Sequence, residues 1–291
     1  MTLKKQWVNE FAENDVISDK VFLVLKKAVP VSKTNKPYLS LTLSDKTGTI
    51  ECRMWDNIDS FKTLFDSGDY IRVSGVVNSY QNSLQLIVKI IEKMDNSLIN
   101  PNNFLPASEY DSKEMIDSLF EFIESMEDEH IKALTHKIFT NDFIFKNYVY
   151  SPAGKSIHHA FIHGLLEHSL SIASLCDKIV ENYSELQIPI NRDLLIAGAL
   201  LHDIGKIYEL DYAKGFTYTS EGQLIGHVVL GYQIMIDIAN TIDDFPQKIK
   251  THLGHLILSH QGSLEFGSPK TPMTLEAFIL HSADEIDSKI N

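Results

Sequence analysis

The sequence predicts two domains in tandem, an all-β barrel followed by an all-α bundle. Up to about residue 95, apolar residues alternate with period two in short runs separated by turn signals, which is typical of strands. After about residue 110 they recur at steps of three and four, which is typical of amphipathic helices. Between the two parts, residues 96–110 are polar and contain Pro101 and Pro106, so we expect a linker there.

Composition and charge bound the function. The 291 residues, 44% of them hydrophobic, suffice for one large or two ordinary domains. The sequence has no apolar run long enough to span a bilayer, no signal-peptide core at its start and no CxxC pair, which predicts a cytoplasmic protein without a membrane partner. The net charge of −13 is uneven: residues 1–95 carry 13 Lys and Arg against 12 Asp and Glu, and residues 96–291 carry 13 against 27. The first part is therefore the better candidate for holding a polyanion.

The first part has the strand order of an OB-fold barrel. Strands are predicted over 21–25, 38–43, 49–55, 70–77 and 84–88, with a short helix over 58–65. Five strands with a helix between the third and the fourth are typical of the OB-fold. Segments 41–50 and 68–75 also resemble the corresponding strands of OB domains that bind nucleic acid.

An OB domain holds a single strand in a cationic groove and stacks bases on aromatic rings. Aromatic residues in a small barrel are more often part of its core, so each residue is a candidate contact and no more. The aromatic candidates are Tyr38, Trp55 and Tyr80, and the cationic ones are Lys33, Lys36 and Arg53.

In the second part, polar residues interrupt apolar helix faces. His168 lies within a stripe of apolar residues at steps of three and four, and the apolar run 194–201 leads directly into His202 and Asp203. Buried groups of this kind are costly unless they are bonded, and each one alone is more often a hydrogen-bonded core residue than a ligand. The decisive question is whether other segments supply the same residue types.

Three further segments do so. His227 opens a helix, and His260 closes one just before Gly262, a natural C-terminal cap. Asp284 lies in a helix that Thr271 and Pro272 are predicted to start, as N-cap and first residue. Five segments that each bring His or Asp to a hydrocarbon face are better explained by one shared cation site. Imidazole ligands favour Mn²⁺, Fe²⁺ or Zn²⁺ over Mg²⁺ alone.

The order of these residues resembles that of the HD-domain phosphohydrolases. The matching local sequences are HHAFIHGLLEHS (158–169), LHDIGK (201–206), GH (226–227), LSHQG (258–262) and HSADEID (281–287). With an OB domain in front, nearly the whole chain is similar to the YhaM-type 3′→5′ exoribonucleases. One departure is Gln261, where this family often has a second histidine.

The resemblance implies a dinuclear site that holds two divalent ions, Mn²⁺ first, with Fe, Zn, Co or Mg as alternatives. The bridging carboxylate and catalytic residue would be Asp203. His255 is a rival to His260, but it lies about 140° around the same helix, and we prefer His260. The first ion would be held by His168, His202, Asp203 and Asp284, and the second by Asp203, His227 and His260.

Three more residues of the second part are assigned to the substrate, Lys206 because it lies one helical turn after His202, and His159 and His163 from the resemblance. Lys206, the second catalytic residue, would donate to a phosphate oxygen; a solvated lysine at a helix end is the alternative. His159 and His163 would contact the scissile phosphate or the terminal sugar; a pair of surface histidines is the alternative. From the barrel, Tyr38, Lys36 and Arg53 would contact the strand.

The predicted function is a metal-dependent 3′→5′ exonuclease, a hydrolase that converts single-stranded RNA to nucleoside 5′-monophosphates. DNA remains open as a second substrate, and so does assembly into a homo-oligomer. One alternative is an HD phosphohydrolase that acts on small or cyclic nucleotides, with a regulatory OB domain. Another is a non-catalytic adaptor that binds nucleic acid. The domains are expected at 1–95 (OB-fold) and 111–291 (HD domain), joined by the linker 96–110.

Overall fold

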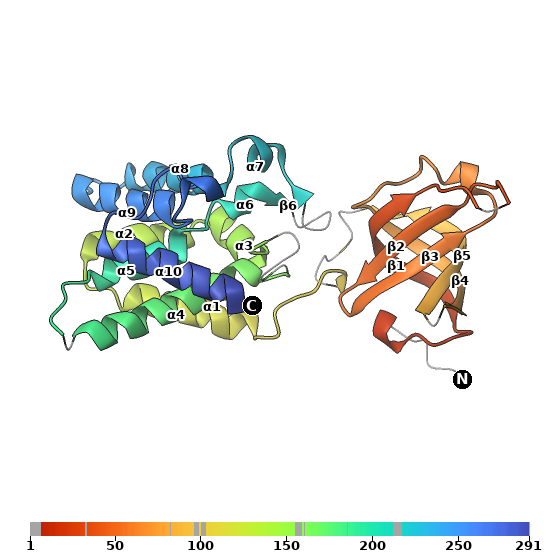
Figure 1. The fold of residues 1–291 in the computed structure, drawn as a ribbon, viewed down its shortest axis with the longest axis horizontal. Helices are drawn as coiled ribbons and strands as arrows, with labels where there is room; N and C mark the ends of the chain where they lie inside the picture. The colour runs from red at the N-terminus through yellow and green to blue at the C-terminus, as the bar shows by residue number, and fades with distance from the viewer. Residues whose placement is uncertain are drawn as a thin grey trace. The chain divides into compact units, whose positions relative to one another are not determined.

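The chain divides into two compact units (Figure 1). The computed structural model describes residues 7–32, 34–81, 83–95, 99, 103–154, 159, 161–184, 186–211 and 217–290. Of these, the residues up to Ala107 form the first unit, and those from Ser108 onward form the second. Among the helices of the described residues, none is long and apolar enough to cross a membrane.

The first unit is a closed barrel in the strand order β1-β2-β3-β5-β4, and the OB-fold prediction is confirmed. β3 and β5 pair in parallel, and the other neighbours pair antiparallel. Gly75 lies where β4 bulges against β5, and a Cβ there would meet the Ile87 carbonyl oxygen at 2.2 Å, so only glycine fits. The strands are β1 (Val16–Ala28), β2 (Leu39–Asp45), β3 (Gly48–Met54), β4 (Tyr70–Tyr80) and β5 (Ser83–Lys93).

The helix predicted over 58–65 is wrong. Only a 3₁₀ turn, Ile58–Ser60, forms there. The ammonium of Lys27 on β1 donates to the carbonyls of Lys62 and Phe65, which fixes the segment in an irregular path while Phe65 stays buried in the barrel core. A cation from a distant strand therefore overrides the local helical pattern.

The last residues of the first unit pack against the barrel. Phe104 and Leu105 are buried, and the Phe104 ring lies edge-on to Tyr70 at 5.0 Å between centroids. The Ser44 hydroxyl donates to the Phe104 carbonyl at 3.1 Å. Part of the segment that was expected to be a linker thus contributes to the core of this unit.

The second unit is helical, as predicted, and its described residues include a two-stranded sheet, β6 (Leu210–Asp211) and β7 (Thr217–Tyr218). The helices in the described residues are α1 (Ser112–Glu124), α2 (Glu129–Phe139), α3 (Asp142–Tyr150), α4 (Gly164–Ser184), α5 (Arg192–Leu201), α6 (Lys206–Glu209), α7 (Ser220–Leu224), α8 (His227–Ala239), α9 (Gln247–Ser259) and α10 (Leu275–Ile290).

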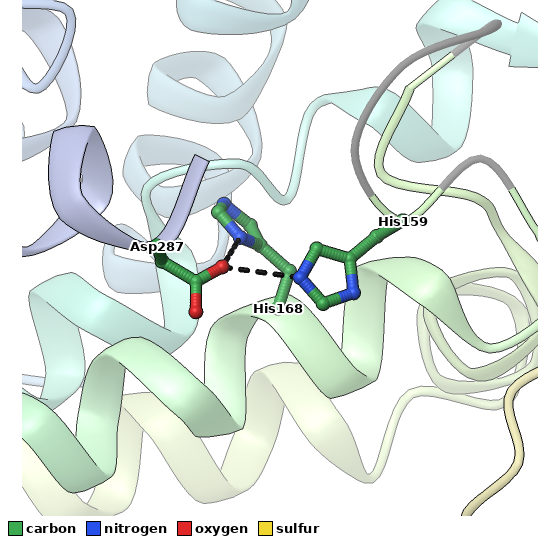
Figure 2. A group of neighbouring side chains, drawn as sticks. All are labelled: His159, His168 and Asp287. Atoms are coloured by element: carbon green, nitrogen blue, oxygen red, sulfur yellow. Dashed lines mark hydrogen bonds and ion pairs between the residues drawn. The ribbon is translucent and has the colours of Figure 1, made fainter. Parts of the chain in front are cut away.

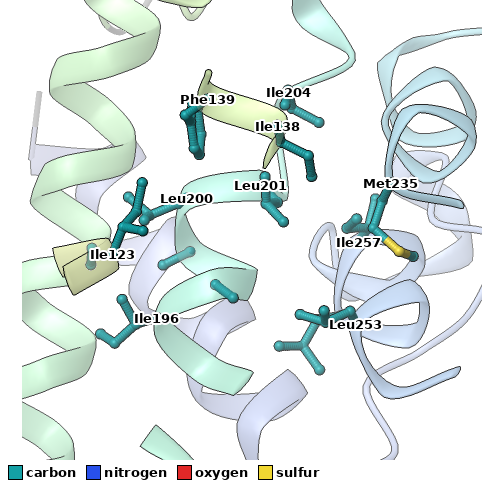
Figure 3. Close-up of a cluster of buried hydrophobic side chains, with 14 of the residues drawn as sticks. Ile123, Ile138, Phe139, Ile196, Leu200, Leu201, Ile204, Met235, Leu253 and Ile257 are labelled. Carbon is teal, nitrogen blue, oxygen red and sulfur yellow. The ribbon is translucent and has the colours of Figure 1, made fainter. Parts of the chain in front are cut away.

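Helix α5 lies at the centre of this unit, and every residue from Asp193 to Leu201 is buried. Figure 3 shows Leu200 and Leu201 among side chains from α2, α8 and α9. A Cβ at Gly198 would come within 2.3 Å of the Leu256 side chain, so α5 and α9 approach closely at that point. Each fully buried leucine contributes about 1.5–3 kcal/mol, so burial of α5 stabilises the position of the polar residues that follow it.

Helix α10 starts later than predicted, at Leu275 and not at Pro272. The Met273 N–H donates to Nε2 of His255 on α9 at 2.9 Å, which holds this segment outside the helix. The Thr274 hydroxyl accepts from the Ala277 N–H at 3.2 Å and takes the N-capping role that Thr271 was expected to have.

Candidate metal centre and nucleic-acid interface

Five segments of the helical unit bring the six predicted ligands together. The apolar faces that bury α4, α5, α9 and α10 also fix where their polar residues lie. His168 lies in the second turn of α4, His202 and Asp203 directly follow α5, His227 begins α8, His260 directly follows α9, and Asp284 lies in α10.

The first group of donor atoms surrounds the Nε2 atom of His168. This atom lies 3.3 Å from His202 Nε2, 3.3 Å from Asp284 Oδ1 and 3.5 Å from Asp203 Oδ2. His202 Nε2 is 3.4 Å from the same Asp203 oxygen. Donor atoms around an ion with bonds of about 2.1 Å lie roughly 3.0–3.5 Å apart, so this spacing fits one shared ion.

The second group surrounds the other oxygen of Asp203. Oδ1 lies 3.4 Å from His227 Nε2 and 3.5 Å from His260 Nε2. Within the described part of the chain, this buried oxygen accepts no hydrogen bond, which is costly unless a cation takes its place. The carboxylate of Asp203 therefore offers one oxygen to each group, as a bridge between two ions would.

All four imidazoles turn Nε2 toward the centre, because Nδ1 is bonded elsewhere. The partners are acceptors only, so Nδ1 carries the proton and Nε2 presents its lone pair. Two such lone pairs, those of His168 and His202, face each other at 3.3 Å and repel unless a cation lies between them. The Nδ1 partners are Ala199 O for His202 (2.8 Å), Ile257 O for His260 (2.7 Å), Asp287 Oδ2 for His168 (2.8 Å) and Glu209 Oε1 for His227 (3.0 Å).

Asp287, one turn after Asp284 on α10, supports the first group. Its carboxylate accepts from His168 Nδ1 at 2.8 Å and from His159 Nε2 at 3.1 Å (Figure 2). It also accepts from the Ser171 hydroxyl. Burial raises the pKa of Asp287, but these hydrogen bonds outweigh burial and leave the pKa below its usual range. These hydrogen bonds fix the Nδ1 side of the His168 ring and so orient its Nε2 atom toward the first group.

Glu209, the last residue of α6, orients a histidine of the second group as Asp287 orients His168 of the first. One of its oxygens accepts from both the Nδ1 and the backbone N–H of His227, each at 3.0 Å. Burial raises the pKa of Glu209, but the bonds from His227 outweigh burial and lower it. Each group thus has one imidazole held by a carboxylate and one held by a backbone carbonyl of its own helix.

Lys206 lies beside both groups. Its ammonium is 2.5 Å from Asp203 Oδ2, and it lines the same cavity of about 210 Å³ as the predicted ligands other than His202. Burial raises the pKa of Asp203, but the charge of Lys206 and the neighbouring imidazoles outweigh burial and hold the pKa well below its usual range. A buried carboxylate that stays ionised is what a bridging ligand requires.

On the barrel, Tyr38 and Trp55 form a stacked pair at the edge where β2 begins and β3 ends. Their ring centroids are 4.5 Å apart at an angle of 28°, and Trp55 is 49% exposed. The Arg53 guanidinium lies 6.0 Å from the Tyr38 centroid and pairs with Glu51 at 3.0 Å. This arrangement offers a flat aromatic face with a cation beside it.

The other predicted contacts of the barrel are less clearly grouped. Lys36 is exposed in the hairpin between Val31 and Pro37. Tyr80, at the end of β4, is 61% exposed. Lys33 lies outside the described residues.

Comparison with known proteins identifies both units. The HD domain family matches residues 165–289, and the family of OB-fold nucleic acid binding domains matches residues 23–94. The 3′-5′ exoribonuclease YhaM of Geobacillus sp. (strain WCH70) is 33% identical over 277 residues, which cover 93% of this chain and 82% of the relative. The YhaM proteins of Listeria welshimeri (34% over 278 residues, 93% and 85%) and Bacillus subtilis strain 168 (33% over 275 residues, 94% and 85%) are equally similar. The chain belongs to the YhaM family.

HD domains are metal-dependent, and the His and Asp groups of this YhaM-family chain could hold ions. The structure places the rival ligand His255 differently from His260. The Nε2 atom of His255 accepts from the Met273 N–H, whereas Nε2 of His260 faces Asp203. The two side chains therefore point in different directions from the end of α9, as their angular separation around the helix predicted.

In this YhaM-family chain, the two histidines assigned to the substrate contact other groups of the protein. His159 directs Nε2 to Asp287 at 3.1 Å and Nδ1 to Glu167 at 3.3 Å, so contact with a phosphate would require one nitrogen to leave its carboxylate. His163 donates from Nδ1 to the Val149 carbonyl at 2.6 Å. Their assignment to the scissile phosphate or the terminal sugar stays a prediction.

Sequence reasoning gave no role to Asp287 or Glu209. Asp287 had a signal, because it follows Asp284 at i+3 and so shares its helix face. Glu209 had no such signal, because its partner His227 lies 18 residues later in the chain.

Proposed function

We propose that this chain is a metal-dependent 3′→5′ exoribonuclease that hydrolyses single-stranded RNA to nucleoside 5′-monophosphates. The observation that carries the proposal is the bridging position of Asp203, whose two oxygens each belong to a separate group of donor atoms at ligand spacing. The family membership supports the same activity, since the relatives carry the name 3′-5′ exoribonuclease.

His168, His202, Asp203 and Asp284 would hold the first ion, and Asp203, His227 and His260 would hold the second. Two bound ions would supply a nucleophile at neutral pH and neutralise charge on the phosphate. Two imidazoles and a carboxylate in each group suit Mn²⁺ better than Mg²⁺, so we propose Mn²⁺ as the native ion.

The protein's own residues would position the scissile phosphate. Lys206 lines the cavity with its ammonium 2.5 Å from Asp203, so a phosphate oxygen seated there could accept from it. Asp287 and Glu209 would keep His168 and His227 in the tautomer that binds an ion. These contacts support a catalytic role for the helical unit.

The barrel would hold the strand. Its sequence is nearly neutral, whereas residues 96–291 carry 14 more acidic than basic residues (27 against 13), so the helical unit would repel RNA outside its centre. The open face of Trp55 would stack a base, with Tyr38 behind it and Arg53 and Lys36 near the backbone.

Labelled oligomers test the proposal. Single strands of RNA and DNA, labelled at either end, are digested by the full chain with Mn²⁺. We expect a 3′ label to appear at once as a mononucleotide and a 5′ label to move stepwise through shorter fragments. Release from the 5′ end, or internal cuts, would contradict the polarity. Hydrolysis of small or cyclic nucleotides without attack on oligomers would favour the alternative substrate class.

A further inference from the structure

The side chain of Gln261 lies next to the second group of donor atoms. Gln261 directly follows His260, is half-buried and lines the same cavity as the ligands predicted for the second ion. Its side-chain nitrogen lies 3.1 Å from His227 Nε2. That distance falls within the range for two atoms bound to one ion with bonds of about 2.1 Å, roughly 3.0–3.5 Å.

The tautomer of His227 decides which amide atom would face an ion. Glu209 accepts the Nδ1 proton of His227, so Nε2 carries the lone pair, and in this structure the Gln261 amide N–H donates to it. An ion on Nε2 would use that lone pair and would repel the amide N–H. A half-turn about the last side-chain bond exchanges the nitrogen for the oxygen with little change of shape.

The surroundings of Gln261 allow this exchange. Its backbone carbonyl is fixed by the Ser263 N–H at 2.9 Å, so the half-turn affects the amide group alone. The present Oε1 faces Gly267, where even an added Cβ would be 3.4 Å away, so the amide NH₂ would have room there. The carbonyl oxygen would then point to the place that Asp203, His227 and His260 surround.

We propose that Gln261 is the fourth protein donor of the second ion, through Oε1. This inference rests on the dinuclear site of the proposed function and deepens it. Its consequence is a difference between the two positions. The first has two imidazoles and two carboxylates, whereas the second has two imidazoles, the shared carboxylate and a neutral amide. With one negative charge fewer, the second position binds its ion more weakly and fills after the first.

Equilibrium binding of Mn²⁺ to the full chain, stripped of metal by a chelator, tests the inference without any activity assay. Free Mn²⁺ is followed by its EPR signal during titration. We expect two ions in the wild type, one tight and one weak. Gln261→Ala should weaken only the weak ion, by roughly tenfold or more, since removing a residue that merely orients a ligand already costs about 10–100-fold. Gln261→Glu should tighten the same ion.

A matched control is Gln233→Ala, which removes an exposed glutamine on α8 that binds Asp237 and should leave both affinities unchanged. Titration with Co²⁺ adds a direct report of the ligands. Gln261→His replaces an oxygen donor with nitrogen and should change the visible absorption of the second equivalent only. Circular dichroism confirms that each variant is folded.

The outcomes separate this inference from the proposed function. Two ions whose affinities and Co²⁺ spectra are indifferent to Gln261 would overturn the inference and leave the dinuclear site standing. Equal weakening of both ions by Gln261→Ala would also overturn it, because Gln261 would then act on the whole centre. Fewer than two ions in the wild type would overturn both.

Discussion

The barrel and the helical unit place their functional candidates in opposite environments. On the barrel, Trp55 is 49% exposed and stacks on Tyr38 at the surface, while the core beneath is formed by apolar side chains. In the helical unit, His202, Asp203 and His260 are all at least 98% buried, next to the central helix α5.

This difference implies that the RNA-binding candidates on the barrel contribute little to the stability of the fold, whereas the metal-binding candidates affect the stability of the helical unit. An exposed ring pair costs little free energy to keep and can change without harm to the fold, because water already solvates it. A buried carboxylate with an orphaned oxygen is costly without a cation, so the helical unit should depend on its ions for stability as well as for chemistry.

The largest effect is expected for Asp203→Ala. The variant loses the one oxygen pair that both groups share, so hydrolysis should fall below detection. Binding of single-stranded RNA should be unchanged, since the barrel is untouched. A filter-binding or anisotropy assay beside the hydrolysis assay measures both, and Asp243→Ala, an exposed aspartate after α8, is the control. Undiminished turnover in a folded Asp203→Ala protein would refute the site.

Removal of metal should destabilise one unit and spare the other. The two tryptophans, Trp7 and Trp55, both belong to the barrel, so their fluorescence reports the barrel alone. Helical circular dichroism reports the other unit. Mn²⁺ at about 100 times its Kd should stabilise the helical unit by about 2.7 kcal/mol, and a chelator should abolish this gain. The fluorescence transition should stay in place; a joint shift of both transitions would contradict the contrast.

The sequence predicts the buried site far better than the exposed one. His168 and His202-Asp203 interrupt apolar faces that the core requires, so the pattern itself marks them. The structure brings together the donor atoms of all six residues chosen on this ground. Exposed aromatic residues interrupt no pattern, and nothing in the spacing distinguishes Trp55 from Tyr80.

What the sequence could not predict depends on contacts between distant segments. The helix expected over 58–65 does not form because Lys27 takes its carbonyls, and α10 starts late because His255 holds Met273. Glu209 supports His227 only because α6 turns back toward α8, and no local signal encodes that approach. These errors arise from hydrogen bonds between distant segments, which the sequence does not reveal. The helical and strand periodicities were sufficient to predict the fold class.

A smaller effect is expected for Asp287→Asn. The amide keeps the shape but no longer offers two acceptor oxygens to His168, His159 and Ser171. We expect the affinity of the first ion to fall about 10–100-fold, with the second ion less affected. Glu285→Gln, two residues earlier on the exposed face of α10, is the matched control. Excess Mn²⁺ should restore much of the hydrolysis; a loss that saturating Mn²⁺ leaves unchanged would show that Asp287 does more than orient His168.

The smallest effect is expected for Trp55→Ala on the barrel. Stacking of one base contributes about 1–3 kcal/mol, so Kd for RNA should rise at least about fivefold at fixed salt. Kd is measured by anisotropy in the Asp203→Ala background, which prevents hydrolysis. Tyr38→Ala should act similarly, and the double variant should lose less than the sum, because the two rings form one stacked surface. Val16→Ala, which is exposed at the start of β1, is the control. Full additivity would mean that the two rings contact the strand independently, and an unchanged Kd would place the strand on another face of the barrel.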